Sequence, residues 1–146
     1  MIKNDEDFIK RIINEIKEFD KSIWYPGIKS IYFHEELKRK IALLGNQLGF
    51  FSVFEKDFWF DCPKLMKRRK GKLDIVWEKN HRIVCIFEID STRKIHSINK
   101  LLNCLSEYKF WIYYGRKNAI YSLRKIDSSQ QIHLIRLESF KDRWKA

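Results

Sequence analysis

Two segments near the start of the chain carry hydrophobic residues at intervals of three and four, the spacing of an amphipathic helix. The first segment begins at a capping Asn4 or Asp5. Its apolar face consists of Phe8, Ile12, Ile13, Ile16 and Phe19. Residues 22–30, which contain a Pro-Gly pair, interrupt the pattern and predict a loop. A second helix is expected at residues 32–47. Its apolar face would consist of Leu37, Ile41, Leu44 and Leu48.

Strand-like and helix-like patterns alternate in the remainder of the chain. Apolar runs rich in β-branched and aromatic residues predict strands at residues 51–60, 73–77, 83–90, 109–114 and 132–137. Helical spacing predicts helices at residues 93–108, 118–125 and 139–145. The resulting order, α-α-β-β-β-α-β-α-β-α, predicts an α/β fold in which helices flank a mixed central sheet.

Three carboxylates stand in strand-like runs where a buried strand is expected to carry none. Asp74 lies inside the run 73–77, while Glu88 and Asp90 close the run 83–90. Burying an unpaired charge is costly, so such acids usually bind a metal, meet a cation or take part in catalysis. The polar residues between the two runs predict a hairpin, which makes the two strands antiparallel.

A hairpin centred on His81 predicts which residues of its two strands face each other, because the numbers of opposed residues then sum to twice 81. The expected pairs are Glu78 with Val84, Val76 with Ile86, Asp74 with Glu88, and Lys72 with Asp90. Directly opposed Cβ atoms lie about 4.5–5.5 Å apart, and two like charges there repel unless a cation lies between them. The pattern therefore suits one hard cation between Asp74 and Glu88.

A strand with Asp, a hairpin, and a strand that ends in Glu-x-Lys together resemble the core of the PD-(D/E)xK nuclease superfamily, which includes restriction endonucleases and archaeal Holliday-junction resolvases. Here the matching residues are Asp74 and Glu88, within residues 33–115. The resemblance implies a restriction-endonuclease-like fold and an endonuclease that hydrolyses DNA, often as a homodimer. It also implies Mg²⁺ or Mn²⁺ held by Asp74, Glu88 and the carbonyl of Ile89, and products with a 5′-phosphate and a 3′-hydroxyl.

The lysine that the resemblance leads us to expect two residues after Glu88 is Asp90 in this chain. In the superfamily that lysine positions the attacking water or helps to deprotonate it, and some members relocate it to a neighbouring helix. Lys72 and Lys100 are the two candidates here, with a cross-strand ion pair and a solvated helix position as the respective alternatives. Asp90 itself is a candidate ligand for a second ion or a candidate base.

The resemblance further implies a glutamate on the first core helix that completes the metal site. At about 100° per residue, Glu36 flanks the apolar face of the helix at 32–47, whereas Glu35 points almost opposite it. Glu36 is therefore the candidate third acid, and the alternative is a surface pair with Lys40 at i+4. His34, on the same helix, either approaches the site or is a structural histidine.

The charge of the chain favours a polyanionic partner. Lysine and arginine total 30 against 19 acids, which gives a net charge of +11 at pH 7. The densest cationic run, residues 64–72, is expected to be a flexible loop placed just before the strand that bears Asp74. Such a loop either neutralises DNA phosphates or is merely solvated. The candidate DNA-binding residues are Lys67, Arg68, Arg69, Lys70 and Lys72.

A chain of 146 residues has the length of one domain. We expect an N-terminal helix and loop at 1–30, the core at 33–115 and a C-terminal extension at 116–146. The three cysteines lack zinc-site spacing, and two of them fall in apolar elements, which is typical of a reducing compartment. With no signal-peptide pattern and no membrane-length apolar run, a soluble cytoplasmic protein is expected.

Two other functional classes remain open on the sequence. The first is a catalytically inactive nucleic-acid-binding module that keeps the nuclease-like fold but has lost the motif lysine. The second is an interaction or inhibitor protein whose acids are structural. The salt dependence of DNA binding distinguishes the two classes. Binding through phosphate contacts must weaken as the salt concentration rises, so binding that does not weaken would favour the interaction or inhibitor protein.

Overall fold

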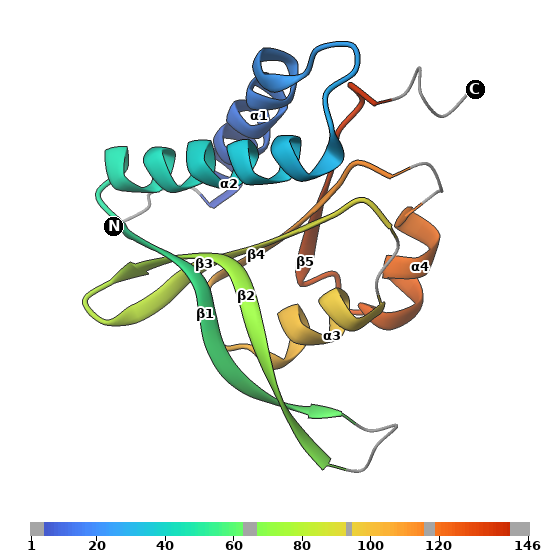
Figure 1. Ribbon diagram of the computed structural model, residues 1–146. Coiled ribbons are helices and arrows are strands. Elements are labelled where there is room, and N and C mark those ends of the chain that lie inside the picture. Colours follow the sequence, from blue (N-terminus) through green and yellow to red (C-terminus); the bar gives the residue numbers. More distant parts are fainter. Residues whose placement is uncertain (1–4, 63–66, 93–94, 116–118, 141–146) are drawn as a thin grey trace.

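The computed structural model describes residues 5–62, 67–92, 95–115 and 119–140 of the chain (Figure 1). The elements in chain order are α1 (Asp5–Ile23), α2 (Ser30–Gln47), β1 (Phe51–Cys62), β2 (Lys67–Lys79), β3 (Arg82–Asp90), α3 (Ile95–Asn103), β4 (Tyr108–Tyr113), α4 (Ala119–Ile126) and β5 (Ile132–Arg136). They confirm the expected α/β class with a mixed sheet. Among the described residues, no helix combines the length and the apolar character that a membrane crossing requires.

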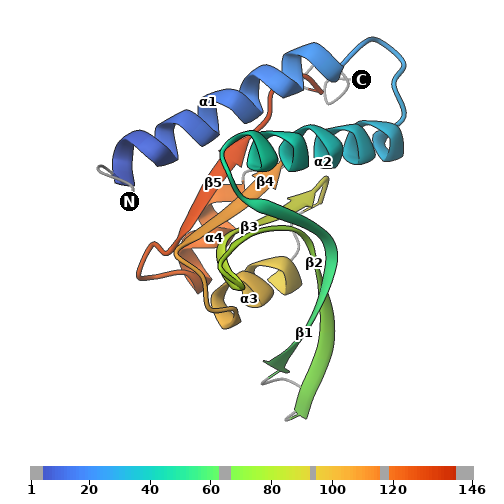
Figure 2. The same cartoon turned by 90° about the vertical axis from the view of Figure 1, so that its left-hand side faces the viewer.

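The five strands form one sheet in the order β1-β2-β3-β4-β5. Hairpins make β1, β2 and β3 antiparallel neighbours, whereas β3, β4 and β5 run parallel. Parallel neighbours need a crossover, and α3 and α4 supply one each. As Figures 1 and 2 show, α1 and α2 cover one face of the sheet, and α3 and α4 lie against the other.

Each face of the sheet has its own apolar core. On the α1/α2 face, Ile16 and Ile41 belong to a buried cluster that includes Phe87 and Phe110 of the central strands. The α3/α4 face has a second cluster, which includes Val76, Ile86, Ile98, Leu101 and Trp111. All six residues of β4 are buried, as are the last seven of β3. The acids that end β3 therefore lie in a covered environment.

The hairpin between β2 and β3 has the expected place and most of the expected register. Asn80 and His81 form a two-residue turn, and both have a positive φ, at 52° and 62°. Such turns match the twist of the strands they join. Opposed residues sum to twice 81 from Ile75 and Phe87 to Trp77 and Cys85, which includes the expected Val76–Ile86 pair.

One predicted pair of this hairpin is wrong, because Glu78 faces Ile83 instead of Val84. The tight turn closes at Lys79 and Arg82, one residue short of the symmetric register. A bulge between Trp77 and Glu78 absorbs the difference.

The cationic run is not a loop where the structure describes it. β2 begins at Lys67, so residues 67–72 form a strand paired with the outer half of β1, from Asp57 opposite Lys72 to Cys62 opposite Lys67. Backbone pairing with β1 replaces the expected flexibility. Residues 64–66 lie outside the described ranges.

Two predicted helices have different ends. α3 stops at Asn103, not at residue 108, because Tyr108 already pairs with Cys85 in the sheet. Cys104 accordingly lies just after the helix and is still buried. Of the helix expected at 139–145, residues 139–140 form a turn, and residues 141–146 lie outside the described ranges.

Candidate functional site

The acidic residues of β2 and β3 meet where the pairing between these strands ends. The ladder stops at Ile75 and Phe87, one residue before Asp74 and Glu88. Hydrogen bonds from backbone to side chain take over at that point. The Asp74 N–H donates to Glu88 Oε2 at 2.8 Å, and the Ile89 N–H donates to Asp74 Oδ2 at 2.8 Å. Each carboxylate is thus held by the backbone of the opposite strand, and the structure brings Asp74 and Glu88 together.

Lys100 reaches this acidic pair from α3, the helix that follows β3. Its ammonium forms an ion pair with Glu88 Oε1 and donates a hydrogen bond to the carbonyl of Lys72 at 2.8 Å. The Glu88 side chain is only 1% exposed, and that of Lys100 only 13%. Of the two lysine candidates, Lys100 therefore places its charge at the site, whereas the side chain of Lys72 is exposed and only its carbonyl takes part.

Burial dominates the electrostatics of the two acids. Desolvation raises the pKa of Glu88 to about 8, with a further increase from the charge of Asp74, against the opposing effect of Lys100. Desolvation also raises the pKa of Asp74, while the Ile89 N–H and His34 act in the opposite direction and Asp90 adds to the increase. Buried acids that have raised pKa values and lie next to other charged groups are typical of functional sites.

The raised pKa of Glu88 predicts that stability falls as the pH rises. The folded protein keeps the Glu88 proton up to about pH 8, whereas the unfolded chain releases it near the ordinary value of 4.5. The folded state binds more protons within this window, so the free energy of unfolding should decrease from about pH 5 to 8. Urea unfolding across that window measures the decrease, and Glu88→Gln should flatten it. An equal decrease in the variant would assign the effect to other groups.

Asp90 is held inside the core instead of facing Lys72. Its side chain accepts a hydrogen bond from the indole Nε1 of Trp111 at 2.9 Å, and its carbonyl accepts one from the Tyr114 N–H at 3.0 Å. The predicted pairing of Lys72 with Asp90 is wrong, because the β2–β3 ladder ends before reaching them and β2 keeps only its β1 neighbour. Asp90 is 6% exposed and fixes the end of β3.

Helix α2 reaches the site through His34. Its Nε2 lies 3.3 Å from the carbonyl oxygen of Ile89 and 3.8 Å from Asp74 Oδ2. Its Nδ1 lies 3.6 Å from Glu35 Oε1. The spacing of the sequence contains the signal, because His34 continues the three-four stripe of Leu37, Ile41, Leu44 and Leu48. Of the two possibilities left open for His34, approach to the site is the one that the structure supports.

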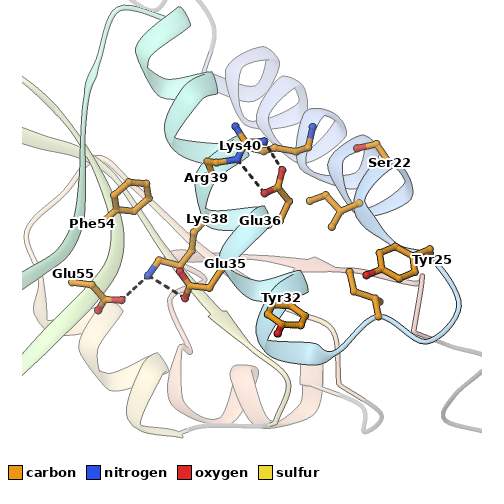
Figure 3. A pocket seen from close by; sticks show the side chains of 12 residues that line it. Ser22, Tyr25, Tyr32, Glu35, Glu36, Lys38, Arg39, Lys40, Phe54 and Glu55 are labelled. Carbon is orange, nitrogen blue, oxygen red and sulfur yellow. Dashed lines mark hydrogen bonds and ion pairs between the residues drawn. The ribbon is translucent and has the colours of Figure 1, made fainter.

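The structure brings Glu36 to Arg39 instead of to the acidic pair. Both carboxylate oxygens of Glu36 contact the Arg39 guanidinium, with 3.0 Å between Oε2 and Nε. Glu36 lines a pocket of about 1020 Å³ next to α2, together with Tyr25, Tyr32 and Phe54 (Figure 3). The alternative of a surface ion pair is present, although the partner is Arg39 at i+3 and not Lys40.

The donor set around Asp74 matches a hard cation in its chemistry. Within the described ranges, no three His, Cys, Asp or Glu side chains form a group that could hold a metal. Mg²⁺ does not require three, because it commonly binds one or two carboxylates together with waters and substrate phosphates. Asp74, Glu88 and the Ile89 carbonyl supply such oxygens. Burial is the main cause of the raised pKa of both acids, and a cation bound beside them would favour their ionised forms.

The cationic candidates lie along the outer part of β2. Arg68, Lys70 and Lys72 are exposed, and the Lys70 ammonium lies 3.6 Å from Asp57 Oδ2. The side chains of Lys67 and Arg69 lie outside the described part of the chain. The exposed cations and Asp74 thus follow each other on one strand, and Glu88 lies on the neighbouring strand.

Comparisons of the chain with protein-family models, with curated proteins and with solved structures found no match. The resemblance to PD-(D/E)xK nucleases therefore stays a hypothesis that depends on Asp74, Glu88 and the order of the elements.

Proposed function

We propose that this chain is a metal-dependent DNA endonuclease that hydrolyses phosphodiester bonds at Asp74 and Glu88. The main support is the pair of crossed hydrogen bonds, which holds two largely buried carboxylates side by side. Two raised pKa values do not suit a pair that serves only to stabilise the fold, because each acid destabilises the folded state once it is ionised.

Each residue of the site has a distinct role in this proposal. Asp74, Glu88 and the Ile89 carbonyl would hold Mg²⁺ or Mn²⁺. The chemistry supplied by a bound ion is activation of water for in-line attack and stabilisation of the leaving oxygen. Lys100 keeps a positive charge beside Glu88 and is held in position by the Lys72 carbonyl. His34 orients the Ile89 carbonyl from α2, which lies on the face of the sheet opposite to α3.

Incubation with plasmid, branched and single-stranded DNA tests the proposal. We expect cleavage of at least one substrate with Mg²⁺ or Mn²⁺ and none in EDTA. Cleavage that persists in EDTA would contradict a metal-dependent mechanism. Failure of every substrate with both metals would contradict the nuclease proposal as a whole.

Lys100→Met should lower the cleavage rate about 10²-fold, because among the described residues Lys100 is the lysine whose ammonium pairs with Glu88 of the site. It should also raise the pKa of Glu88, which the Lys100 charge lowers. Single-turnover cleavage over a pH series at saturating protein measures both effects. Lys72→Met is the matched comparison. It should weaken DNA binding by a larger factor than it lowers the cleavage rate at saturating protein. The reverse pattern would assign the lysine role to Lys72.

A second candidate is a nucleic-acid-binding module without catalysis. Asp90 favours it, since this residue occupies the motif lysine position and is buried against Trp111. Such a module would bind DNA through phosphate contacts, so its affinity would fall as the salt concentration rises. It would leave the DNA uncleaved in the presence of Mg²⁺ or Mn²⁺.

A further inference from the structure

The outer halves of β1 and β2 form a two-stranded ribbon that extends beyond the rest of the sheet. Their pairing runs from Lys56 opposite Leu73 to Cys62 opposite Lys67, whereas β3 pairs with β2 only from Ile75 onward. In Figures 1 and 2 the ribbon projects past α3 and away from α1 and α2. One face of this ribbon is therefore free of the helices that cover the sheet.

Cross-strand pairing defines what that free face carries. Trp59 lies opposite Lys70, and Asp57 lies opposite Lys72, so these four share a face. Arg68 belongs to it as well, two residues along β2 from Lys70. We call Trp59, Arg68, Lys70 and Lys72 the outer face. The inner face carries Phe58 and Leu73, which belong to the core cluster on the α3/α4 side.

The outer face combines exposed cations with an exposed indole. The three cations are all exposed, and Trp59 is 58% exposed. A tryptophan is usually buried over most of its surface, so this exposure favours a contact surface. The face also carries two acids, because Asp57 lies 3.6 Å from the Lys70 ammonium, with its side chain 53% exposed, and Asp61 lies opposite Arg68 in the register. Three cations against two acids leave the face with a net positive charge.

The outer face leads directly to the acidic pair. Lys72 precedes Asp74 by two residues, and its carbonyl binds Lys100. Leu73 and Val76 both belong to the cluster on the α3/α4 face, so the regular alternation of β2 is interrupted between them. Lys72 is the direct neighbour of Leu73 and therefore lies on the side of the strand opposite to Leu73. That is the side from which His34 approaches Asp74. A polyanion lying along the outer face would therefore reach the acidic pair.

We propose that the outer face binds B-form duplex DNA, with the ribbon in the major groove and Arg68, Lys70 and Lys72 against the phosphates. Its link to cleavage rests on the proposed function, whereas the binding itself does not. The major groove is about 12 Å wide and admits a two-stranded ribbon, whereas the A-form groove is too narrow. Single-strand platforms stack successive bases on several aromatic rings, and the described outer face offers one.

Binding of a labelled 20-base-pair duplex in EDTA, measured by fluorescence anisotropy at several salt concentrations, tests this surface without cleavage. The double variant Arg68→Ala/Lys70→Ala should reduce the slope of log K against log salt by about 2. Trp59→Ala should weaken binding about fivefold and leave the slope unchanged. The matched controls are Lys21→Ala and Tyr25→Ala, an exposed cation and an exposed aromatic remote from the ribbon, and both should bind like the wild type.

An unchanged slope in the double variant would overturn the proposal, as would tighter binding of single strands or duplex RNA, or no binding of nucleic acid at all. The two proposals fail separately. If the ribbon variants bind normally while Asp74→Asn abolishes cleavage, the ribbon proposal fails and the nuclease stands. If the ribbon variants lose binding and the wild type cleaves nothing with either metal, the nuclease fails and the ribbon proposal stands.

Discussion

Replacing Asp74 with asparagine is expected to lower metal-dependent cleavage at least about 10³-fold while leaving the protein folded. The amide keeps the size of the side chain and can still accept the Ile89 N–H hydrogen bond, but it removes the negative charge that would hold a cation. Loss of one charged group that acts directly on the reacting centre commonly costs about 10²–10³ in rate, and loss of the metal costs more. Glu88→Gln should have the same effect for the same reason. Initial rates of plasmid cleavage in Mg²⁺ measure both.

Two further glutamates make this result interpretable. Glu18→Gln removes a surface carboxylate paired with Lys21 on α1 and should cleave like the wild type. Glu36→Gln tests the third acid that the sequence suggested, and we expect little change because that carboxylate binds Arg39. If Asp74→Asn cleaves like Glu18→Gln, the acidic pair is not the catalytic site.

Stability separates a catalytic pair from a structural pair. If Asp74 and Glu88 served mainly to hold β2 and β3 together, replacing them would lower the melting temperature. Both acids have raised pKa values, so their ionised forms oppose folding, and neutral isosteres should melt at the same or a higher temperature near pH 8. Residues that lower the stability of the folded protein in this way are typical of functional sites.

The acidic pair could be predicted from the sequence because local rules determine it. A polar tetrapeptide between two β-prone runs gives the hairpin, and strand alternation then brings Asp74 close to Glu88. The bulge at Trp77 and Glu78 was not predictable from the same rules, because it depends on how the Asn80–His81 turn closes. It leaves the pair unchanged, since the register returns before Ile75.

Contacts between elements that are far apart in the sequence were harder to predict from it. The choice of Lys100 over Lys72 depends on how α3 lies across the end of β3, and helical spacing alone does not contain that information. The choice of His34 over Glu36 depends on the rotation of α2, although the stripe that His34 shares with Leu37 was readable. The ribbon was missed because a cationic run resembles a loop in composition, and only its pairing with β1 makes it a strand.

Gly45→Ala is expected to destabilise the protein by about 2–4 kcal/mol, although the same change at an exposed helix position would stabilise it by up to about 1 kcal/mol. A Cβ on Gly45 would lie 2.6 Å from both Cδ1 and Cε2 of Trp77, closer than real contacts allow. Trp77 is fully buried, donates its Nε1–H to the Ile41 carbonyl at 3.2 Å and stacks on Phe50. Relief of the clash requires either this ring or α2 to move, and both movements sacrifice buried contacts and the hydrogen bond.

Thermal unfolding measures this effect, which should amount to roughly 10 °C for a chain of this size. Gly49→Ala is the matched control, because it adds the same methyl group where no heavy atom lies within 4 Å and the φ of +92° costs only about 1–2 kcal/mol. Adding Trp77→Phe to Gly45→Ala should recover part of the loss, since the smaller ring leaves room for the methyl group. The close packing of α2 on β2 also determines how far His34 reaches toward Ile89. If Gly45→Ala melts like the wild type, α2 does not lie on Trp77 at this distance, and the contribution of His34 to the site loses its geometric basis.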